Sequence, residues 1–228
     1  MFMIQRIGHR GAAGYITENT IPSFEKALEM NVNAIELDVH ICASGELVVF
    51  HDFTLDRLTN GTGEISKLTL QELKALQINN QYQIPTLEEV LQLIDKRCWV
   101  NIELKGRNTA SSVLPLVEKY ITKFNWTLEY FLISSFQREE LETLRKLDSF
   151  IPMAVLTQAS VEQAIEWATE LQAKAIHPHF SLLTFENCLL AQEKGFQINT
   201  WTVNESATIS HLKQYPINGI ISDFPDLL

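Results

Sequence analysis

After Pro85, stretches in which apolar residues recur at helical spacing alternate with short apolar stretches of strand length. This pattern predicts helices and strands in regular alternation. The helices are expected over residues 87–96, 111–124, 137–147, 161–171, 184–194 and 205–214, and the strands over 98–105, 130–135, 152–156, 174–177, 196–203 and 218–222. Such alternation is typical of parallel strands with helices on the outside of the sheet.

The first part of the chain adds three strand-like segments, over residues 3–7, 34–40 and 47–50. The few residues between the second and the third are too short for a crossover helix, which needs a dozen or more residues, so an antiparallel hairpin is expected there. If His40 faces Leu47 in this hairpin, the pairing places His51 opposite Glu36.

With the hairpin included, the strand-like segments number one more than a (β/α)8 barrel requires, and the extra one is an arm of the hairpin. We therefore predict an α/β fold, a (β/α)8 TIM-type barrel that forms a single domain over residues 1–228. An insertion is expected at about 52–85, which is polar and turn-rich with a short helix over 70–76. A doubly wound open sheet is the alternative, although a Gly-rich dinucleotide turn after the first strand is missing.

Two of the predicted strands carry charge on one face. In the strand before the hairpin, Glu36 and Asp38 point to the same side, because alternate side chains of a strand face opposite ways. Glu103 and Lys105 repeat this pattern on a later strand. Buried strands of parallel sheets are normally almost unbroken apolar runs, so the charge suggests function. A solvated edge strand is the alternative for the first of these strands.

The carboxylates of Glu36, Asp38 and Glu103 are hard oxygen ligands without a matching pair of cysteines or histidines. This donor set favours Ca²⁺ or Mg²⁺ over Zn²⁺. A cation would also relieve the repulsion between neighbouring carboxylates. We therefore predict that these three residues hold one divalent cation, Ca²⁺ or Mg²⁺. A surface ion pair of Glu103 with Lys105 or with an exposed lysine is the alternative.

Active sites of such barrels lie at the C-terminal ends of the strands, where further polar residues occur in this chain. Arg10 and Lys105 are the cationic residues nearest the acids. A planar guanidinium and a compact ammonium both suit a phosphate, although these groups could also only neutralise the acids. A cation, an arginine and a lysine around one point describe a phosphoryl-transfer site.

Two histidines, His9 and His51, also lie at strand ends. Beside a divalent cation, one can take a proton from an attacking hydroxyl while the other protonates the leaving alkoxide. We therefore predict that both are catalytic, with a structural role as the alternative. Structural or substrate-lining roles are expected of the remaining histidines, of which His179 is the best placed to reach the site.

Composition limits the partners of the protein. The chain has 228 residues, a net charge of -10 and a pI near 5.1, which argues against general binding of nucleic acid. Its three cysteines match no zinc or disulfide spacing and suit a reducing compartment. Residues 1–6 are too few and too polar for a signal sequence, and no apolar run approaches the ~18 residues of a membrane helix. We expect a soluble cytoplasmic protein without a stable membrane anchor, and the sequence leaves the oligomeric state open.

Short motifs from residue 7 to the C-terminus resemble those of the glycerophosphodiester phosphodiesterases, and they occur in the same order. The motifs are His9-Arg10-Gly11, Glu18-Asn19-Thr20, Glu36-Leu37-Asp38-Val39, Phe50-His51-Asp52, Leu55-Asp56-Arg57, Pro85-Thr86-Leu87, Glu103-Leu104-Lys105, Trp201-Thr202-Val203-Asn204 and Asp223 with Pro225-Asp226. Ser44, where an Asp is frequent, and Leu58, where a Thr is frequent, depart from the family pattern but lie outside the expected catalytic set.

The resemblance implies a TIM-type barrel with an insertion after His51-Asp52. It also implies Ca²⁺- or Mg²⁺-dependent cleavage of glycerophosphodiesters, such as glycerophosphocholine and glycerophosphoethanolamine, into sn-glycerol 3-phosphate and an alcohol. The implied metal ligands, acid and base, and phosphate contacts are those proposed above from the residues alone. Trp201 and the insertion would border the glycerol and alcohol pockets. The family's usual setting is glycerol and lipid metabolism.

Two other functions remain open at this point. A non-enzymatic barrel that binds a phosphorylated ligand would be expected to lack one of the acids or histidines, and none is missing. The same chemistry on lysophospholipids or phosphoinositides would favour an apolar rim or a membrane anchor, which this acidic chain does not offer.

Overall fold

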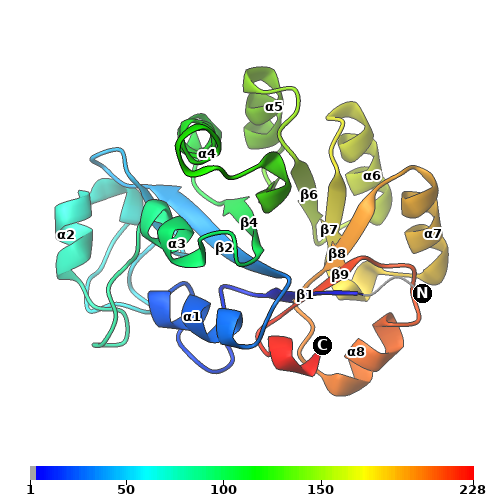
Figure 1. The fold of residues 1–228 in the computed structure, drawn as a ribbon, viewed down its shortest axis with the longest axis horizontal. Coiled ribbons are helices and arrows are strands. Elements are labelled where there is room, and N and C mark those ends of the chain that lie inside the picture. Colours follow the sequence, from blue (N-terminus) through cyan, green and yellow to red (C-terminus); the bar gives the residue numbers. More distant parts are fainter. Residues whose placement is uncertain (1–3) are drawn as a thin grey trace.

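The computed structural model describes residues 4–228, in which eight parallel strands form a closed barrel (Figure 1). The strands are β1 (Gln5–Gly8), β2 (Ala34–Ile41), β4 (Trp99–Leu104), β5 (Phe131–Ser135), β6 (Met153–Thr157), β7 (Ala175–Pro178), β8 (Gln197–Thr200) and β9 (Gly219–Ser222). The barrel closes because β1 pairs in parallel with both β2 and β9. The predicted (β/α)8 barrel is therefore confirmed, and the open sheet is excluded.

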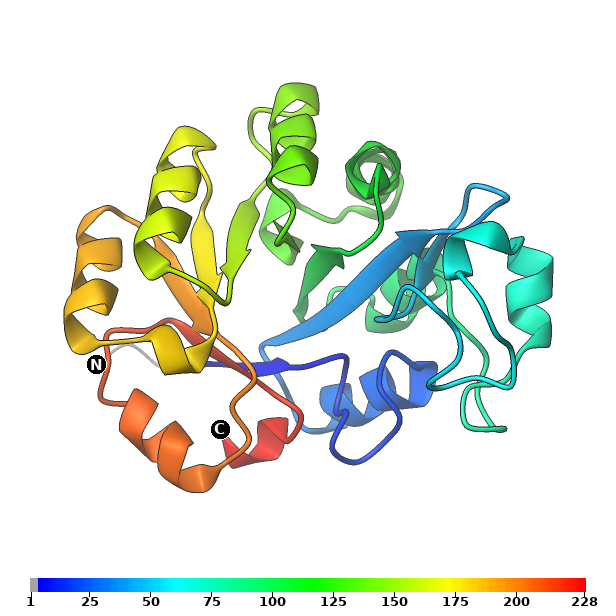
Figure 2. The ribbon, with the colours of Figure 1, turned by 180° about the vertical axis from the view of Figure 1, so that it is seen from behind.

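Helices connect the strands and surround the barrel (Figures 1 and 2). They are α1 (Ile21–Glu29), α2 (Leu70–Ala75), α3 (Leu87–Ile94), α4 (Thr109–Phe124), α5 (Arg138–Leu147), α6 (Val161–Glu170), α7 (Phe185–Glu193) and α8 (Ser206–Leu212), with short 3-10 turns at Ile65–Lys67, Leu128–Tyr130, Phe180–Leu182 and Pro225–Leu227. Each predicted helix after Pro85 is present with ends shifted by a few residues. Among residues 4–228, no helix has the length and apolar character needed to cross a membrane.

Most predicted strands are present with ends shifted by one residue, and two differ further. Met3, where the first strand was expected to begin, lies outside the described residues, and β1 is described from Gln5. The strand expected over 196–203 ends at Thr200. Beyond it, Trp201 makes an isolated bridge to His179, and Val203 is buried in the main apolar core. The apolar character of Val203 therefore reflects burial in the core and not a place in a strand.

Strand β3 (Leu47–Val49) pairs with β2 in the predicted antiparallel hairpin, but the predicted register is wrong by one residue. His40 faces Val48, so His51 does not lie opposite Glu36 in the ladder. The backbone N–H of Cys42 donates to the carbonyl of Glu46, which closes a three-residue loop over residues 43–45. Gly45 supplies the positive φ of +99° that this loop requires.

Residues 52–85 follow the hairpin and lie beside it (Figure 2). This segment has apolar residues that pack with the hairpin in one cluster, made of Cys42, Val48, Phe50, Leu55, Ile65, Leu73, Ile78 and Ile84. Helix α2 begins at a capping box, in which Thr69 and Glu72 satisfy each other's backbone N–H groups. The segment is thus anchored to the barrel through the hairpin.

The alternation of side chains along β2 determines which residues face the helices and which face the barrel interior. Ile35, Leu37 and Val39 belong to the main apolar core between the sheet and the helices. Glu36 and Asp38 therefore face the other way, into the barrel. Because β2 is parallel to β4 and Asp38 pairs with Glu103 in the register, carboxylates from two strands meet at one level inside the barrel.

Candidate active site

Three carboxylates meet inside the barrel near the C-terminal ends of β2 and β4. Oxygen atoms of Glu36, Asp38 and Glu103 lie within 4.8 Å of one another. All three residues are buried, with exposed fractions of 3%, 0% and 8%. The three predicted metal ligands thus form one cluster of hard oxygen donors.

Electrostatics make this cluster unfavourable without a cation. Burial and repulsion by Asp38 raise the pKa of Glu36 well above its usual value, and the same two causes raise that of Glu103 to about 7. Burial also acts to raise the pKa of Asp38, but Arg10 and Lys105 outweigh it and hold that pKa below the usual range. Within residues 4–228, Oδ1 of Asp38 lacks a hydrogen-bond partner. A buried acceptor without a donor, among mutually repelling acids, fits a hard divalent cation.

Two positively charged side chains, those of Arg10 and Lys105, contact the carboxylates. Nε of Arg10 lies 3.3 Å from Oδ2 of Asp38, and its backbone N–H donates to Oε2 of Glu36 at 3.0 Å. Nζ of Lys105 lies 3.0 Å from Oε1 of Glu103 and 3.8 Å from Oδ1 of Asp38. Both cationic side chains are only slightly exposed, so their charge is weakly screened by water.

His9, at the end of β1, is held by the end of the last strand. Its Nδ1 lies 2.6 Å from Oδ1 of Asp223, and its Nε2 lies 4.0 Å from Oε2 of Glu36. Asp223 is held in turn by Asn204, whose Nδ2 donates to Oδ2 at 2.6 Å. Burial acts to raise the pKa of Asp223, but the contact with His9 outweighs it and the pKa is lowered. Asp223 therefore stays ionised and orients the imidazole so that Nε2 faces the acids.

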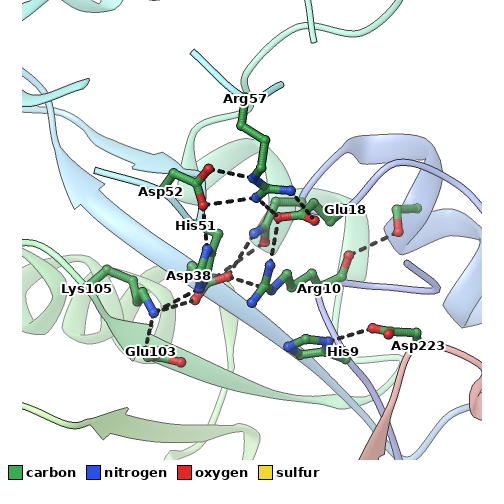
Figure 3. A network of polar contacts seen from close by, with 12 residues as sticks. His9, Arg10, Glu18, Asp38, His51, Asp52, Arg57, Glu103, Lys105 and Asp223 are labelled. Carbon is green, nitrogen blue, oxygen red and sulfur yellow. Dashed lines mark hydrogen bonds and ion pairs between the residues drawn. The ribbon is translucent and has the colours of Figure 1, made fainter. Parts of the chain in front are cut away.

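His51 follows β3 and approaches the cluster from another side (Figure 3). Its Nδ1 lies 2.7 Å from Oδ1 of Asp52, and its Nε2 lies 3.1 Å from Nζ of Lys105. Because an ammonium only donates, Nε2 accepts and the ring proton sits on Nδ1, where it is donated to Asp52. Burial and the positive charges of Arg10 and Lys105 lower the pKa of His51, although Asp38 opposes them.

Trp201 belongs to an aromatic wall on the Lys105 side of the site. Its ring meets those of Phe136 and His179 edge-on, at centroid distances of 5.5 and 5.1 Å. Its Nε1 donates to the carbonyl of His177 at 2.7 Å. Nζ of Lys105 lies 5.9 Å from the centroid of Phe136. The wall thus connects Trp201 to the predicted phosphate-contacting lysine.

The other histidines have contacts that fit structural roles. His40 is buried with Nε2 at 3.3 Å from the carbonyl of His51. His177 is fully buried, which lowers its pKa to about 3, and its Nε2 pairs with Nδ2 of Asn199 at 3.0 Å. His179 packs in the aromatic wall, and exposed His211 contacts the hydroxyl of Tyr215.

The network contains residues that the predicted set leaves out. They include Glu18, Asp52, Arg57 and Asp223, which Figure 3 labels, and Asn204, all in loops. All five residues belong to the sequence motifs that resemble the family, although no role was predicted for them. Position gives a further signal for two, since Asp52 directly follows a predicted catalytic histidine and Asp223 directly follows the last strand. Arg57 lies in the irregular segment, where no periodicity indicates the direction of a side chain.

Comparisons of the sequence and of the fold with known proteins all lead to phosphodiesterases. The sequence profile of the Glycerophosphoryl diester phosphodiesterase family matches residues 9–227. A glycerophosphodiester phosphodiesterase of Caldanaerobacter subterraneus is 33% identical over 231 residues, covering 97% of this chain and 95% of that protein. One of Bacillus altitudinis is 33% identical over 241 residues, covering 98% and 96%. The structure of a phosphodiesterase of Oleispira antarctica, in complex with the product sn-glycerol-3-phosphate, superposes with a TM-score of 0.89 at 28% identity, covering 97% of this chain and 94% of that one.

Proposed function

Because the chain belongs to the Glycerophosphoryl diester phosphodiesterase family and is a phosphodiesterase, we propose that it hydrolyses glycerophosphodiesters such as glycerophosphocholine and glycerophosphoethanolamine to sn-glycerol 3-phosphate and an alcohol. The observation that carries this proposal is the arrangement of two carboxylate-held histidines on either side of the three buried acids. Arg10 and Lys105 stand between them. The product bound to the Oleispira relative supports the assignment of the substrate class.

The three acids are the proposed ligands of one divalent cation, Ca²⁺ or Mg²⁺. Glu36, Asp38 and Glu103 provide the hard oxygen donors that these ions prefer. When bound, the cation supplies positive charge that lowers the pKa of a nearby hydroxyl and stabilises a phosphoryl transition state. The side chains of Arg10 and Lys105 would contact the phosphate oxygens, and Trp201 would border the glycerol or alcohol group.

The two histidines take different roles in this proposal. Nε2 of His51 is unprotonated, so it is the base that takes the proton of the attacking glycerol hydroxyl. The new bond between that oxygen and phosphorus forms as the bond to the alcohol breaks, and His9 gives its proton to the leaving alkoxide. Water then opens the cyclic phosphate with the roles exchanged, which yields sn-glycerol 3-phosphate. Asp52 and Asp223 orient the rings throughout.

A substrate panel tests the substrate class. The purified protein is incubated with glycerophosphocholine, glycerophosphoethanolamine and lysophosphatidylcholine, and release of the phosphomonoester product is followed by mass spectrometry. The proposal expects sn-glycerol 3-phosphate from the first two. Faster cleavage of lysophosphatidylcholine would contradict the proposal and indicate lysolipids as the substrate class.

The organisation of the chain is part of the proposal. We propose one domain over residues 1–228, because the segment 52–85 shares an apolar cluster with Val48 and Phe50, and so packs against the hairpin that extends from the barrel. The cytoplasmic location expected from the sequence stays a prediction.

Glu36→Gln is expected to change how stability depends on pH in excess chelator. Glu36 has a raised pKa in the folded protein, so between the ordinary value of 4.5 and that raised value the folded state binds more protons than the unfolded state. Its contribution to stability therefore falls as pH rises. Gln removes this contribution but can still accept the backbone N–H of Arg10.

The measurement is the Tm of both proteins at pH 5 and pH 8. In excess chelator, the Tm of the unsubstituted protein is subtracted from that of Glu36→Gln, and this difference should be more positive at pH 8 than at pH 5. His177 and the other titrating groups are present in both proteins, so their effect cancels in the difference. With saturating Ca²⁺ or Mg²⁺, Glu36→Gln should instead have the lower Tm, because only the unsubstituted protein keeps all three ligands. A difference that is independent of pH would contradict the account of Glu36.

A further inference from the structure

Arg57 occupies a central place between two loops at the mouth of the barrel (Figure 3). Its Nε lies 2.6 Å from Oδ2 of Asp52 and its Nη2 lies 3.0 Å from Oδ1 of the same carboxylate. Its Nη2 and Nη1 also lie 2.7 and 3.2 Å from the two carboxylate oxygens of Glu18. One guanidinium therefore holds two carboxylates, each through two hydrogen bonds, a geometry that lysine does not offer.

Each of these carboxylates also holds a residue of the proposed machinery. Oδ1 of Asp52 accepts the Nδ1 proton of His51 at 2.7 Å. Oε1 of Glu18 accepts from Nη1 of Arg10 at 2.7 Å. The hydrogen bond from Arg57 lowers the pKa of Asp52 to about 2, so Asp52 remains the charged acceptor that His51 needs.

We propose that Arg57 is a positioning residue that sets His51 through Asp52 and Arg10 through Glu18, and so aligns the base with the phosphate contact. The inference rests on the proposed function. Arg57 joins two segments that are distant in sequence, since Glu18 belongs to the loop after β1, whereas Asp52 and Arg57 both lie in the segment 52–85 that follows β3. A second contact, from Nδ2 of Asn79 to Oγ1 of Thr17 at 2.9 Å, joins the same two loops.

The contacts of Arg57 argue for an indirect role. Nε and both terminal nitrogens of the guanidinium already donate to carboxylates, so a phosphate would have to displace one of them. The side chain of Arg57 is 47% exposed, and ion pairs of exposed side chains contribute little to stability. Loss of Arg57 should therefore leave the fold nearly unchanged while disturbing the alignment of the site.

Arg57→Gln tests the inference. Because misplacement of a reacting group by about 1 Å can cost roughly 100-fold in rate, the variant is expected to lower kcat/KM about 10- to 100-fold, with both a lower kcat and a higher KM. Arg57→Lys should recover only part of the loss. The matched control is Arg138→Gln on α5, because Arg138 also joins two carboxylates, those of Glu142 and Glu170. It should keep kcat/KM within about two-fold and show a similar small change in Tm.

A second comparison separates positioning from direct contact with the substrate. In a Glu18→Gln, Asp52→Asn background, Arg57 has lost both charged partners, so adding Arg57→Gln should lower kcat/KM by less than about two-fold. A loss as large as in the unsubstituted background would mean that Arg57 acts on the substrate itself and would overturn the inference. Unchanged kinetics of Arg57→Gln would do the same. If the unsubstituted protein released no sn-glycerol 3-phosphate, the proposed function would fail instead.

Discussion

His51→Ala is expected to lower kcat for release of sn-glycerol 3-phosphate by a factor on the order of 10²–10⁴, the range typical of a lost acid or base. The variant removes the imidazole that contacts both Asp52 and Lys105, with Nε2 at 3.1 Å from the ammonium. The bond to Asp52 also disappears, but Arg57 continues to hold that carboxylate. The loss should therefore appear mainly in kcat and much less in the Tm.

Steady-state kinetics with saturating cation provide the measurement. His211→Ala is the matched control, because His211 is exposed on α8 and its side chain hydrogen-bonds only the hydroxyl of Tyr215 within residues 4–228. It should keep kcat within about two-fold. Turnover of His51→Ala close to that of the control would remove His51 from the mechanism and leave Asp52 as a structural partner only.

Glu103→Gln is expected to weaken binding of the divalent cation before any other property changes. The substitution removes one of three buried carboxylates and leaves Lys105 with Asp38 as its remaining carboxylate neighbour. A ligand at 100 times its Kd stabilises a protein by about 2.7 kcal/mol, or roughly 5–10 °C in Tm for a chain of this size. The unsubstituted protein should show this rise, and the variant should lose most of it at the same cation concentration.

Titration calorimetry measures the affinity directly. Glu140→Gln serves as the control, since Glu140 is also a buried carboxylate but accepts the backbone N–H of Ala110 at the start of α4. Its loss should lower the Tm without changing cation affinity. An unchanged affinity in Glu103→Gln would refute the assignment of this residue as a ligand.

The strand pattern made much of the site predictable. Charges with a period of two along β2, and along β4 and the residue that follows it, place Glu36, Asp38, Glu103 and Lys105 on one side of the sheet. That they meet follows from parallel pairing of the two strands, with Asp38 opposite Glu103. The hairpin register was not predictable in the same way, because it depends on the exact length of the loop around Gly45.

The remaining contacts of the site depend on closure of the barrel and on the conformation of loops. His9 meets Asp223 across 214 positions of sequence only because the first strand pairs with the last. Arg57 meets Glu18 across 39 positions through two irregular segments, where neither period two nor period 3.6 fixes the direction of a side chain. Local sequence therefore predicts which strand residues face the site but not the loop residues that orient them.

The most direct test of the account is release of sn-glycerol 3-phosphate from glycerophosphocholine by the purified protein, measured with Ca²⁺, with Mg²⁺ and with excess chelator. The account predicts release with at least one of the cations, loss of release in chelator, and recovery when the cation is restored. Release that persists undiminished in chelator would contradict the proposed role of the three carboxylates. No release with either cation, from a folded sample, would contradict the proposed substrate.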